Sequence, residues 1–247
     1  MLRFIAALPT LLAFTCLPAA AVVGGAQIAD PDIARHVVMI AGERSLCSGV
    51  AIGTDLVLTA AHCVLENGKY RLIASEGRRK TSKEVSAVTS HPQFSPRSDA
   101  PDLALVKLAA KPPANLSPVA FSERRTPPSV GDRFIVAGFG LAAQGDRKSA
   151  GRLRTATLVA TDRPNSQLLS LVDPQNLGES PGLGVCNGDS GGPVLDERDR
   201  TLVGIISYTA RSGGEPVCGF VSGIIPLPRY RYWIAETATK LGTSLEP

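Results

Sequence analysis

Cys186-Asn187-Gly188-Asp189-Ser190-Gly191-Gly192-Pro193 is the most informative stretch of this chain. Three glycines surround an Asp-Ser pair, which predicts a tight turn, because glycine adopts backbone conformations that side chains resist. Such a turn presents one hydroxyl and aims neighbouring N–H groups at a common point. A nucleophile beside preformed oxyanion donors is what acyl transfer requires. On its own, the stretch also fits a glycine-rich β-turn with a solvated serine.

A nucleophilic serine needs a base, and the chain has three histidines. His62 ends an apolar run and is followed directly by Cys63, so it is the candidate that is held most rigidly. His36 opens another apolar run and is expected at a strand edge. His91 precedes a proline and is expected in a loop.

The histidine in turn needs a carboxylate that orients it. Asp102 directly precedes Leu103–Leu108, an apolar strand pattern that would fix its position. Asp99 is the rival, but it lies among Ser, Arg, Ala and Pro in an expected loop. Asp102 is therefore the better candidate.

The stretches Leu58-Thr59-Ala60-Ala61-His62-Cys63, Asp102-Leu103-Ala104-Leu105 and Gly188–Pro193 resemble motifs of the trypsin/chymotrypsin family of serine proteases. They occur in the order His, Asp, Ser, which separates this family from subtilisins and α/β-hydrolases. Val22-Val23-Gly24-Gly25 resembles the family's mature amino terminus, and the resemblance runs from Val22 to about Leu241. It implies an all-β fold of two six-stranded antiparallel Greek-key β-barrels with a C-terminal α-helix and a site between the barrels.

Composition agrees with this fold. A chain of 247 residues with 24 Gly, 19 Pro and 5% aromatics favours many short strands joined by turns. The net charge of +4 is mild, and the basic clusters at 78–80 and 124–125 lack interleaved aromatic residues. Nucleic-acid binding is therefore not expected.

Residues 1–21 resemble a secretory signal peptide: Arg3 is followed by the apolar run Phe4–Leu17 and by Ala19-Ala20-Ala21. Small residues are favoured at positions −3 and −1, so cleavage is expected after Ala21. The enzyme is then secreted or periplasmic. No other segment approaches membrane-spanning length.

Four cysteines remain after this leader, and an even number in an exported protein predicts disulfides. Three pairings are open from the sequence. The resemblance implies Cys47–Cys63, beside His62, and Cys186–Cys218, beside Ser190. So few cysteines favour a microbial exported member of the family.

The hydrophobic pattern predicts strands and a terminal helix. Expected strands are 36–40, 47–52, 56–60, 70–74, 85–89, 103–108, 133–137, 153–160, 192–195, 202–208 and 220–225. Barrel one is expected at about 22–115 and barrel two at about 119–228, joined by a proline-rich linker at 110–118, all within one protease domain at 22–247. A helix at about 229–241 places Tyr230, Trp233, Ile234, Thr237 and Leu241 on one face, with Gly242 as its C-cap.

The resemblance also implies roles. His62 is the general base, Asp102 orients it, Ser190 is the nucleophile, and the Gly188 and Ser190 N–H groups bind the oxyanion. Asp189 receives the α-ammonium of Val22, because a lone buried carboxylate is costly. Removal of the leader after Ala21 would then itself create the activating terminus.

Specificity rests on a few further positions. Gly184 corresponds to the base of the primary pocket, where trypsin-like enzymes carry Asp, and Ser207-Tyr208-Thr209 resembles the wall that pairs with substrate backbone. With Gly223 opposite, small to medium uncharged side chains are expected. Ser48 and Tyr208 depart from common family choices, and a long loop from Ala210 to Val217 is able to bring Glu215 into the pocket.

The expected partners are protein or peptide substrates and protein protease inhibitors, with a monomeric enzyme and no cofactor, metal, nucleic acid or membrane. Two alternatives remain. A non-catalytic binding protein on the same scaffold would leave Ser190 unreactive. A stress-type quality-control protease usually has Asn before the serine, so Asp189 argues against it.

Overall fold

The computed structural model describes residues 22–43, 45–64, 68–76, 79–96, 101–110, 112, 116–124, 128–161, 168–210 and 217–245. The expected leader, Asp99, Glu215, Arg78, Arg125 and part of the 110–118 linker lie outside these residues.

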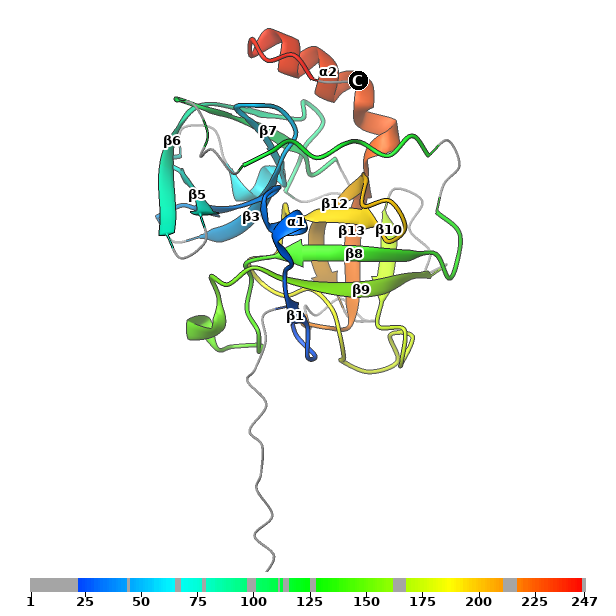
Figure 1. Ribbon diagram of the computed structural model, residues 1–247. Coiled ribbons are helices and arrows are strands. Elements are labelled where there is room, and N and C mark those ends of the chain that lie inside the picture. Colours follow the sequence, from blue (N-terminus) through cyan, green and yellow to red (C-terminus); the bar gives the residue numbers. More distant parts are fainter. Residues whose placement is uncertain are drawn as a thin grey trace, which may run out of the picture.

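Two closed antiparallel barrels lie side by side (Figure 1). The first barrel closes in the order β2-β3-β4-β7-β6-β5. Its strands are β2 (Val37–Ala41), β3 (Leu46–Ala51), β4 (Leu56–Thr59), β5 (Arg71–Glu76), β6 (Arg79–Ser90) and β7 (Ala104–Leu108).

The second barrel closes in the order β9-β10-β13-β12-β11-β8, because β8 also pairs with β9. Its strands are β8 (Arg133–Gly138), β9 (Arg154–Thr161), β10 (Leu169–Val172), β11 (Pro193–Asp196), β12 (Leu202–Ala210) and β13 (Val221–Pro226). This architecture confirms the fold class expected from the sequence. The strand β10 was missed, although it closes the second barrel by pairing with both β9 and β13.

Branched apolar side chains fill the barrels. Leu56, Leu58 and Leu105 are fully buried in the first, and Phe134 and Leu158 in the second. The apolar core of the first barrel continues through Phe139 and Ile205 into the interface between the barrels. Burial of apolar surface stabilises a fold by about 25 cal/mol per Å², so this shared core helps to hold the two barrels together at their junction.

The segment before the first barrel belongs to the second. Strand β1 (Gln27–Ile28) pairs with β9, and Val22 packs in the core of the second barrel. Residues 22–28, which the sequence assigns to barrel one, therefore lie on barrel two. The short helix α1 (Pro31–Ala34) follows, capped by Asp30, whose carboxylate accepts from the Ile33 N–H at 2.9 Å. An Asp-Pro start of this kind is a capping signature that the sequence interpretation overlooked.

The expected C-terminal helix is present as α2 (Arg231–Lys240), preceded by the 3-10 turn η3 (Leu227–Tyr230). It lies at the top of the molecule in Figure 1. Ile234, Thr237 and Ala238 are its buried residues, and Gly242 follows its end with φ +72°. Among the described residues, no helix is long and apolar enough to span a membrane.

Candidate active site

The three candidate catalytic residues meet at the junction of the barrels. His62 lies in the 3-10 turn η1 (Ala61–Cys63) just after β4, and Asp102 lies two residues before β7. Ser190 lies in the turn that leads into β11 on the second barrel. All three line one pocket of 430 Å³.

His62 is held at two points by Asp102. Its ring Nδ1 lies 2.6 Å from Oδ2 of Asp102, and its backbone N–H donates to Oδ1 at 2.9 Å. An ionised carboxylate only accepts, so Nδ1 carries the proton and Nε2 is left as an acceptor. The imidazole is 42% exposed, which leaves it accessible to a substrate.

Asp102 stays ionised although it is only 7% exposed. Burial raises its pKa, but hydrogen bonds and charge from His62 and a hydrogen bond from Ser207 outweigh burial, so the net shift of the pKa is downward. Ser207 Oγ donates to Oδ2 at 2.7 Å. Ser207 therefore contacts the carboxylate, a contact that its expected place in the substrate-binding wall did not suggest.

The Ser190 hydroxyl points into the same pocket. In this structure it donates to the Ser207 carbonyl at 3.2 Å rather than to His62. Hydrogen bonds of catalytic groups are often loose in free enzymes and tighten only with substrate. The geometry thus places a serine, a histidine and the buried carboxylate that holds this histidine in one pocket.

The turn before Ser190 exposes two N–H donors. Among the described residues, neither the Gly188 N–H nor the Ser190 N–H has an acceptor. Gly188 has φ +99°, and a Cβ there would lie 2.8 Å from Cα of Gly140, so no side chain fits. Two unpaired N–H groups beside a hydroxyl are what an oxyanion site requires.

Ser48 fastens this turn to the first barrel. Its hydroxyl donates to the Gly188 carbonyl at 2.9 Å and accepts from the Phe139 N–H at 2.9 Å. Its own N–H donates to the Ser190 carbonyl at 2.8 Å. The residue noted as a departure from common family choices is thus a fully buried bridge between the barrels.

Asp189 is fully buried beneath the turn. Its two oxygens accept from the Gly140 and Cys186 N–H groups, each at 2.8 Å. Burial raises the pKa of this carboxyl to about 7, although these hydrogen bonds and Arg154 lower it. Asp189 has no direct ionic partner among the described residues.

The segment Val22–Val23 is already inserted in the second barrel. Val22 is fully buried, with a φ of +49°. Val23 pairs with Gly184, donating to its carbonyl at 3.0 Å and accepting from its N–H at 3.3 Å. The two residues therefore occupy a defined slot next to the Asp189 turn.

The expected pocket residues divide into two groups. A Cβ on Gly223 would meet the Tyr208 ring at 2.2 Å, so Gly223 lies under Tyr208 and does not face Gly184. Ser222, which precedes Gly223 in β13, faces Gly184 instead. A Cβ on Gly184 would lie 3.4 Å from Oγ of Ser222. Thr209 pairs with Ser222 across β12 and β13.

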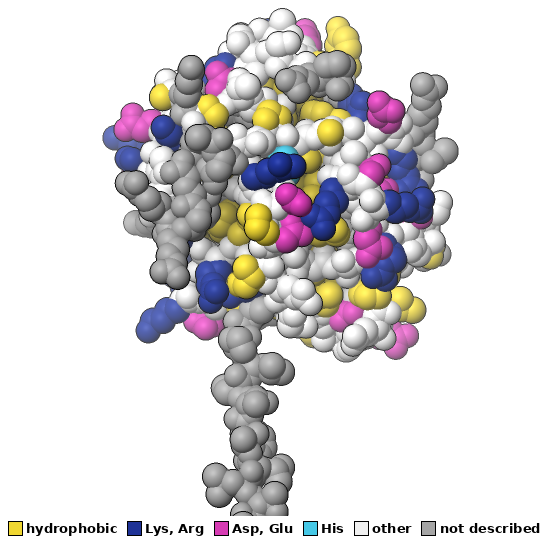
Figure 2. Space-filling model, in the orientation of Figure 1, with side chains coloured by type: hydrophobic (Ala, Val, Ile, Leu, Met, Phe, Trp, Pro, Cys, Tyr) yellow, Lys and Arg dark blue, Asp and Glu magenta, His cyan; other side chains and the backbone are white. Residues whose placement is uncertain are grey.

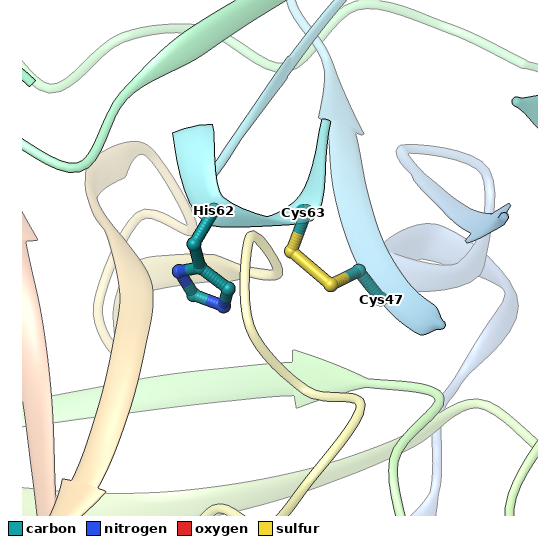
Figure 3. Close-up of side chains that lie close together, drawn as sticks. All are labelled: Cys47, His62 and Cys63. Carbon is teal, nitrogen blue, oxygen red and sulfur yellow. A yellow bond between two sulfur atoms is a disulfide. The ribbon is translucent and has the colours of Figure 1, made fainter. Parts of the chain in front are cut away.

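Both expected disulfides are present, Cys47–Cys63 and Cys186–Cys218. Figure 3 shows the His62 ring and the Cys47–Cys63 bond side by side beneath the turn that carries His62 and Cys63. Two sulfurs and a ring nitrogen this close suggest a metal site. The sulfurs are bonded to each other, however, and are not the thiolates that bind metals.

The other two histidines lie away from the site. Nδ1 of His36 lies 2.7 Å from the Ser117 carbonyl. His91 packs against Tyr230 and Trp233 beneath the C-terminal helix. Burial lowers the pKa of both rings, which fits neutral structural histidines.

The trypsin family matches residues 22–234, and so spans the barrels and the pocket. The chain belongs to the trypsin family. Human cathepsin G is 30% identical over 245 residues, 92% of each chain. Human granzyme M is 31% identical over 180 residues, 67% of this chain and 70% of that protein.

Human serine protease 56 is 32% identical over 192 residues, 71% of this chain but 32% of that protein, so this member spans about a third of its length. The family match and these relatives make this trypsin-family member a serine endopeptidase.

Solved structures show the same fold. Neuropsin, a serine protease of mouse brain, superposes with a TM-score of 0.70 at 22% identity, over 86% of this chain and 98% of that one. Human heparin binding protein superposes with a TM-score of 0.73 at 19% identity, over 91% and 99%. One of these proteins is named for proteolysis and the other for heparin, so this fold does not by itself decide catalysis.

Proposed function

We propose that this serine endopeptidase is exported and cleaves proteins or peptides with a catalytic triad of His62, Asp102 and Ser190. The observation that supports this most directly is the convergence of the three side chains on one pocket beside two N–H groups that have no acceptor in the described part of the chain. The heparin-named neighbour shows why the residues, and not the fold, carry this proposal.

The roles follow from the contacts. As the Ser190 hydroxyl attacks the substrate carbonyl, His62 Nε2 takes its proton, and the imidazolium formed is stabilised by Asp102. His62 then gives the proton to the leaving amine, and an acyl-enzyme remains on Ser190. Water, activated by the same histidine, releases the acyl group.

The Gly188 and Ser190 N–H groups would hold the negative oxygen of the tetrahedral intermediate. Loss of one such donor typically costs about 100- to 1,000-fold in rate. Ser48 holds the peptide group between Gly188 and Asp189 from the opposite barrel, so the donors would need no rearrangement when charge develops.

Activation would follow export. Cleavage after Ala21 would free the Val22 amino group, and the Val23–Gly184 pairing already places Val22 in its buried slot. The new ammonium would pair with Asp189 and lower its pKa. The two disulfides fit the oxidising compartment that a leader implies. N-terminal sequencing of exported protein tests this step: a start at Ala19 or Ala20 would require a second cleavage.

Substrate preference would be for small to medium uncharged side chains before the cut bond. Gly184 would place no charge at the base of the primary pocket, and Thr209, which lines the pocket of His62 and Ser190, would narrow its mouth. A peptide library varied at that position measures the preference, and a strict Arg or Lys preference would overturn the assignment. In the Gly184→Asp variant, we expect a gain of cleavage after Arg and Lys.

The proposed partners are protein or peptide substrates and protein protease inhibitors. The enzyme itself is proposed to be a monomer. Figure 2 shows Lys and Arg side chains interspersed with Asp and Glu on the face it displays. Among the described residues, several opposite charges form ion pairs, such as Arg133 with Glu197 at 2.7 Å. Such mixing does not favour a nucleic-acid surface.

A fluorophosphonate probe decides between the endopeptidase and a non-catalytic binding protein. We expect one adduct per molecule, located by mass spectrometry on Ser190 and absent from the Ser190→Ala variant. The Ser86→Ala variant is the matched control, because that hydroxyl donates to the carbonyls of Lys107 and Leu108, far from the pocket residues. A correctly disulfide-bonded protein that gives no adduct would favour the binding protein.

A further inference from the structure

Arg154 is a charged residue inside the second barrel. It stands at the start of β9 and is 3% exposed. Its Nε and Nη1 atoms have no hydrogen-bond partner among the described residues. A buried guanidinium with unpaired donors is costly unless an anion compensates it, so the surroundings of Arg154 require an explanation.

The strand register points this side chain toward Asp189. Arg154 pairs with Gly138 of β8. Paired residues of antiparallel strands place their side chains on the same face, with Cβ atoms about 5 Å apart. A Cβ on Gly138 would lie 2.3 Å from Oδ1 of Asp189. Arg154 therefore lies on the same face of the sheet as this carboxyl, and glycine at 138 leaves room for the carboxyl beside it.

Arg154 and Asp189 each favour the charged form of the other. Burial raises the pKa of Asp189, and Arg154 acts against this rise. Burial and the neighbouring Arg152 lower the pKa of Arg154, and Asp189 acts against that fall. The attraction operates without a direct hydrogen bond between the two side chains.

We propose that Arg154 is an internal counter-charge for Asp189, which helps to keep this carboxyl ionised and the oxyanion turn ordered while Val22 is still joined to Ala21. The proposal rests on the proposed function of the turn. Asp189 is the acceptor for the Gly140 and Cys186 N–H groups, so its charge ties the start of the turn to the segment that follows β8.

Two cations share one carboxylate once the Val22 ammonium arrives. The ammonium then supplies most of the compensation, and the contribution of Arg154 falls. Arg154 is thus a positioning residue that sets the activity of a chain extended at its amino terminus. It has little effect on a chain that begins at Val22.

The test compares two forms of the enzyme, one beginning at Val22 and one beginning at Ala20. Each is made with Arg154, with Arg154→Met and with Arg154→Lys. The first readout is the rate of fluorophosphonate labelling. The second, which needs no catalysis, is hydrogen exchange of the 186–192 segment.

In the extended form, we expect Arg154→Met to slow labelling about tenfold or more and to increase exchange of the segment, because the buried carboxylate loses its counter-charge. In the form that begins at Val22, the same substitution should change labelling less than about threefold. Arg154→Lys should restore most of the rate in the extended form.

Equal effects of Arg154→Met in both forms would reduce Arg154 to a structural residue and overturn the proposal. So would an extended form that is unlabelled, with an unprotected 186–192 segment, while Arg154 is present. If the Val22 form itself is unlabelled, the proposed function fails, and the exchange comparison still judges the role of Arg154. Should Arg154→Met not fold, Arg154→Gln replaces it.

Discussion

The two halves of the active site are assembled in different ways. On the first barrel, His62 and Asp102 are joined by two hydrogen bonds, and Ser207 of the second barrel adds a third to the carboxylate. On the second barrel, burial raises the pKa of Asp189 to about 7, and two donors of the nearby Arg154 guanidinium have no partner among the described residues. The hydrogen bonds of the first half are all formed, whereas Asp189 in the second half has no direct ionic partner among the described residues. Under the proposed activation, control of activity would therefore belong to the second half.

The largest effect is expected from a substitution in the His62–Asp102 pair. Asp102→Asn should lower kcat about ten-thousandfold, because the amide stabilises the wrong histidine tautomer. The loss should be the same in forms that begin at Val22 and at Ala20, since this half does not depend on the terminus. Steady-state kinetics on a peptide substrate measure it, with exposed Asp146→Asn as the control. A loss below tenfold would remove Asp102 from the triad.

A smaller loss is expected from a methyl group in the oxyanion turn. Gly188→Ala should lower kcat about 100-fold or more, because the new Cβ meets Gly140 and displaces a donor N–H. Gly131→Ala is a matched control: Gly131 also has a positive φ, of +86°, but its Cβ would meet nothing within 4 Å. If the two variants lose activity equally, backbone strain and not donor geometry is responsible.

The pH dependence of stability should separate the two halves without any assay of catalysis. The folded-state pKa of Asp189 is raised above that of an unfolded chain, so the folded extended form binds the proton more tightly. Its unfolding free energy should therefore fall as pH rises from about 4 to about 7, and then level off.

The form that begins at Val22 should lose this fall, because its ammonium stabilises the carboxylate. Denaturant titrations at several pH values measure both forms. Asp189→Asn in the extended form is the control and should remove the slope as well. If the unfolding free energy depends on pH in the same way in all three proteins, a group other than Asp189 titrates. The charge that faces Asp189 here is Arg154.

The smallest effect concerns the bridge between the halves. Ser48→Ala should cost about 1–3 kcal/mol of stability, because it leaves the Phe139 N–H and the Gly188 carbonyl buried without their partner. Activity should fall only several-fold, since the donor N–H groups themselves remain. Ser86→Ala serves as the surface control in the same unfolding and kinetic measurements. No change in either quantity would mean that the bridge is dispensable.

The sequence predicted what local chemistry determines and missed what strand pairing determines. The glycine-rich turn, the histidine turn and the acid before β7 carry their signals in a few adjacent residues, and the structure brings them together. The strand β10 has only four residues, too few for a clear local pattern, and it is recognised by its pairing with β9 and β13.

Register explains two further features that the sequence did not reveal. Gly223, which was expected in the pocket, lies under Tyr208, and its neighbour Ser222 faces Gly184, because successive residues of a strand point to opposite faces of the sheet. Arg154 looks like an ordinary polar residue of an alternating strand. Only its pairing with Gly138 reveals that it lies beside Asp189. Neither fact is contained in a local pattern.

The backbone at Val22 carries one more consequence. Its φ of +49° is unfavourable for a β-branched residue, and strain of this kind costs about 1–3 kcal/mol. A φ torsion exists only while a carbonyl carbon precedes the nitrogen. Hydrolysis of the Ala21–Val22 bond would abolish the torsion itself, so the stored strain would be released in the same event that creates the new charge. Re-forming the peptide bond would require the strained torsion again, so the release of strain would favour the cleaved form.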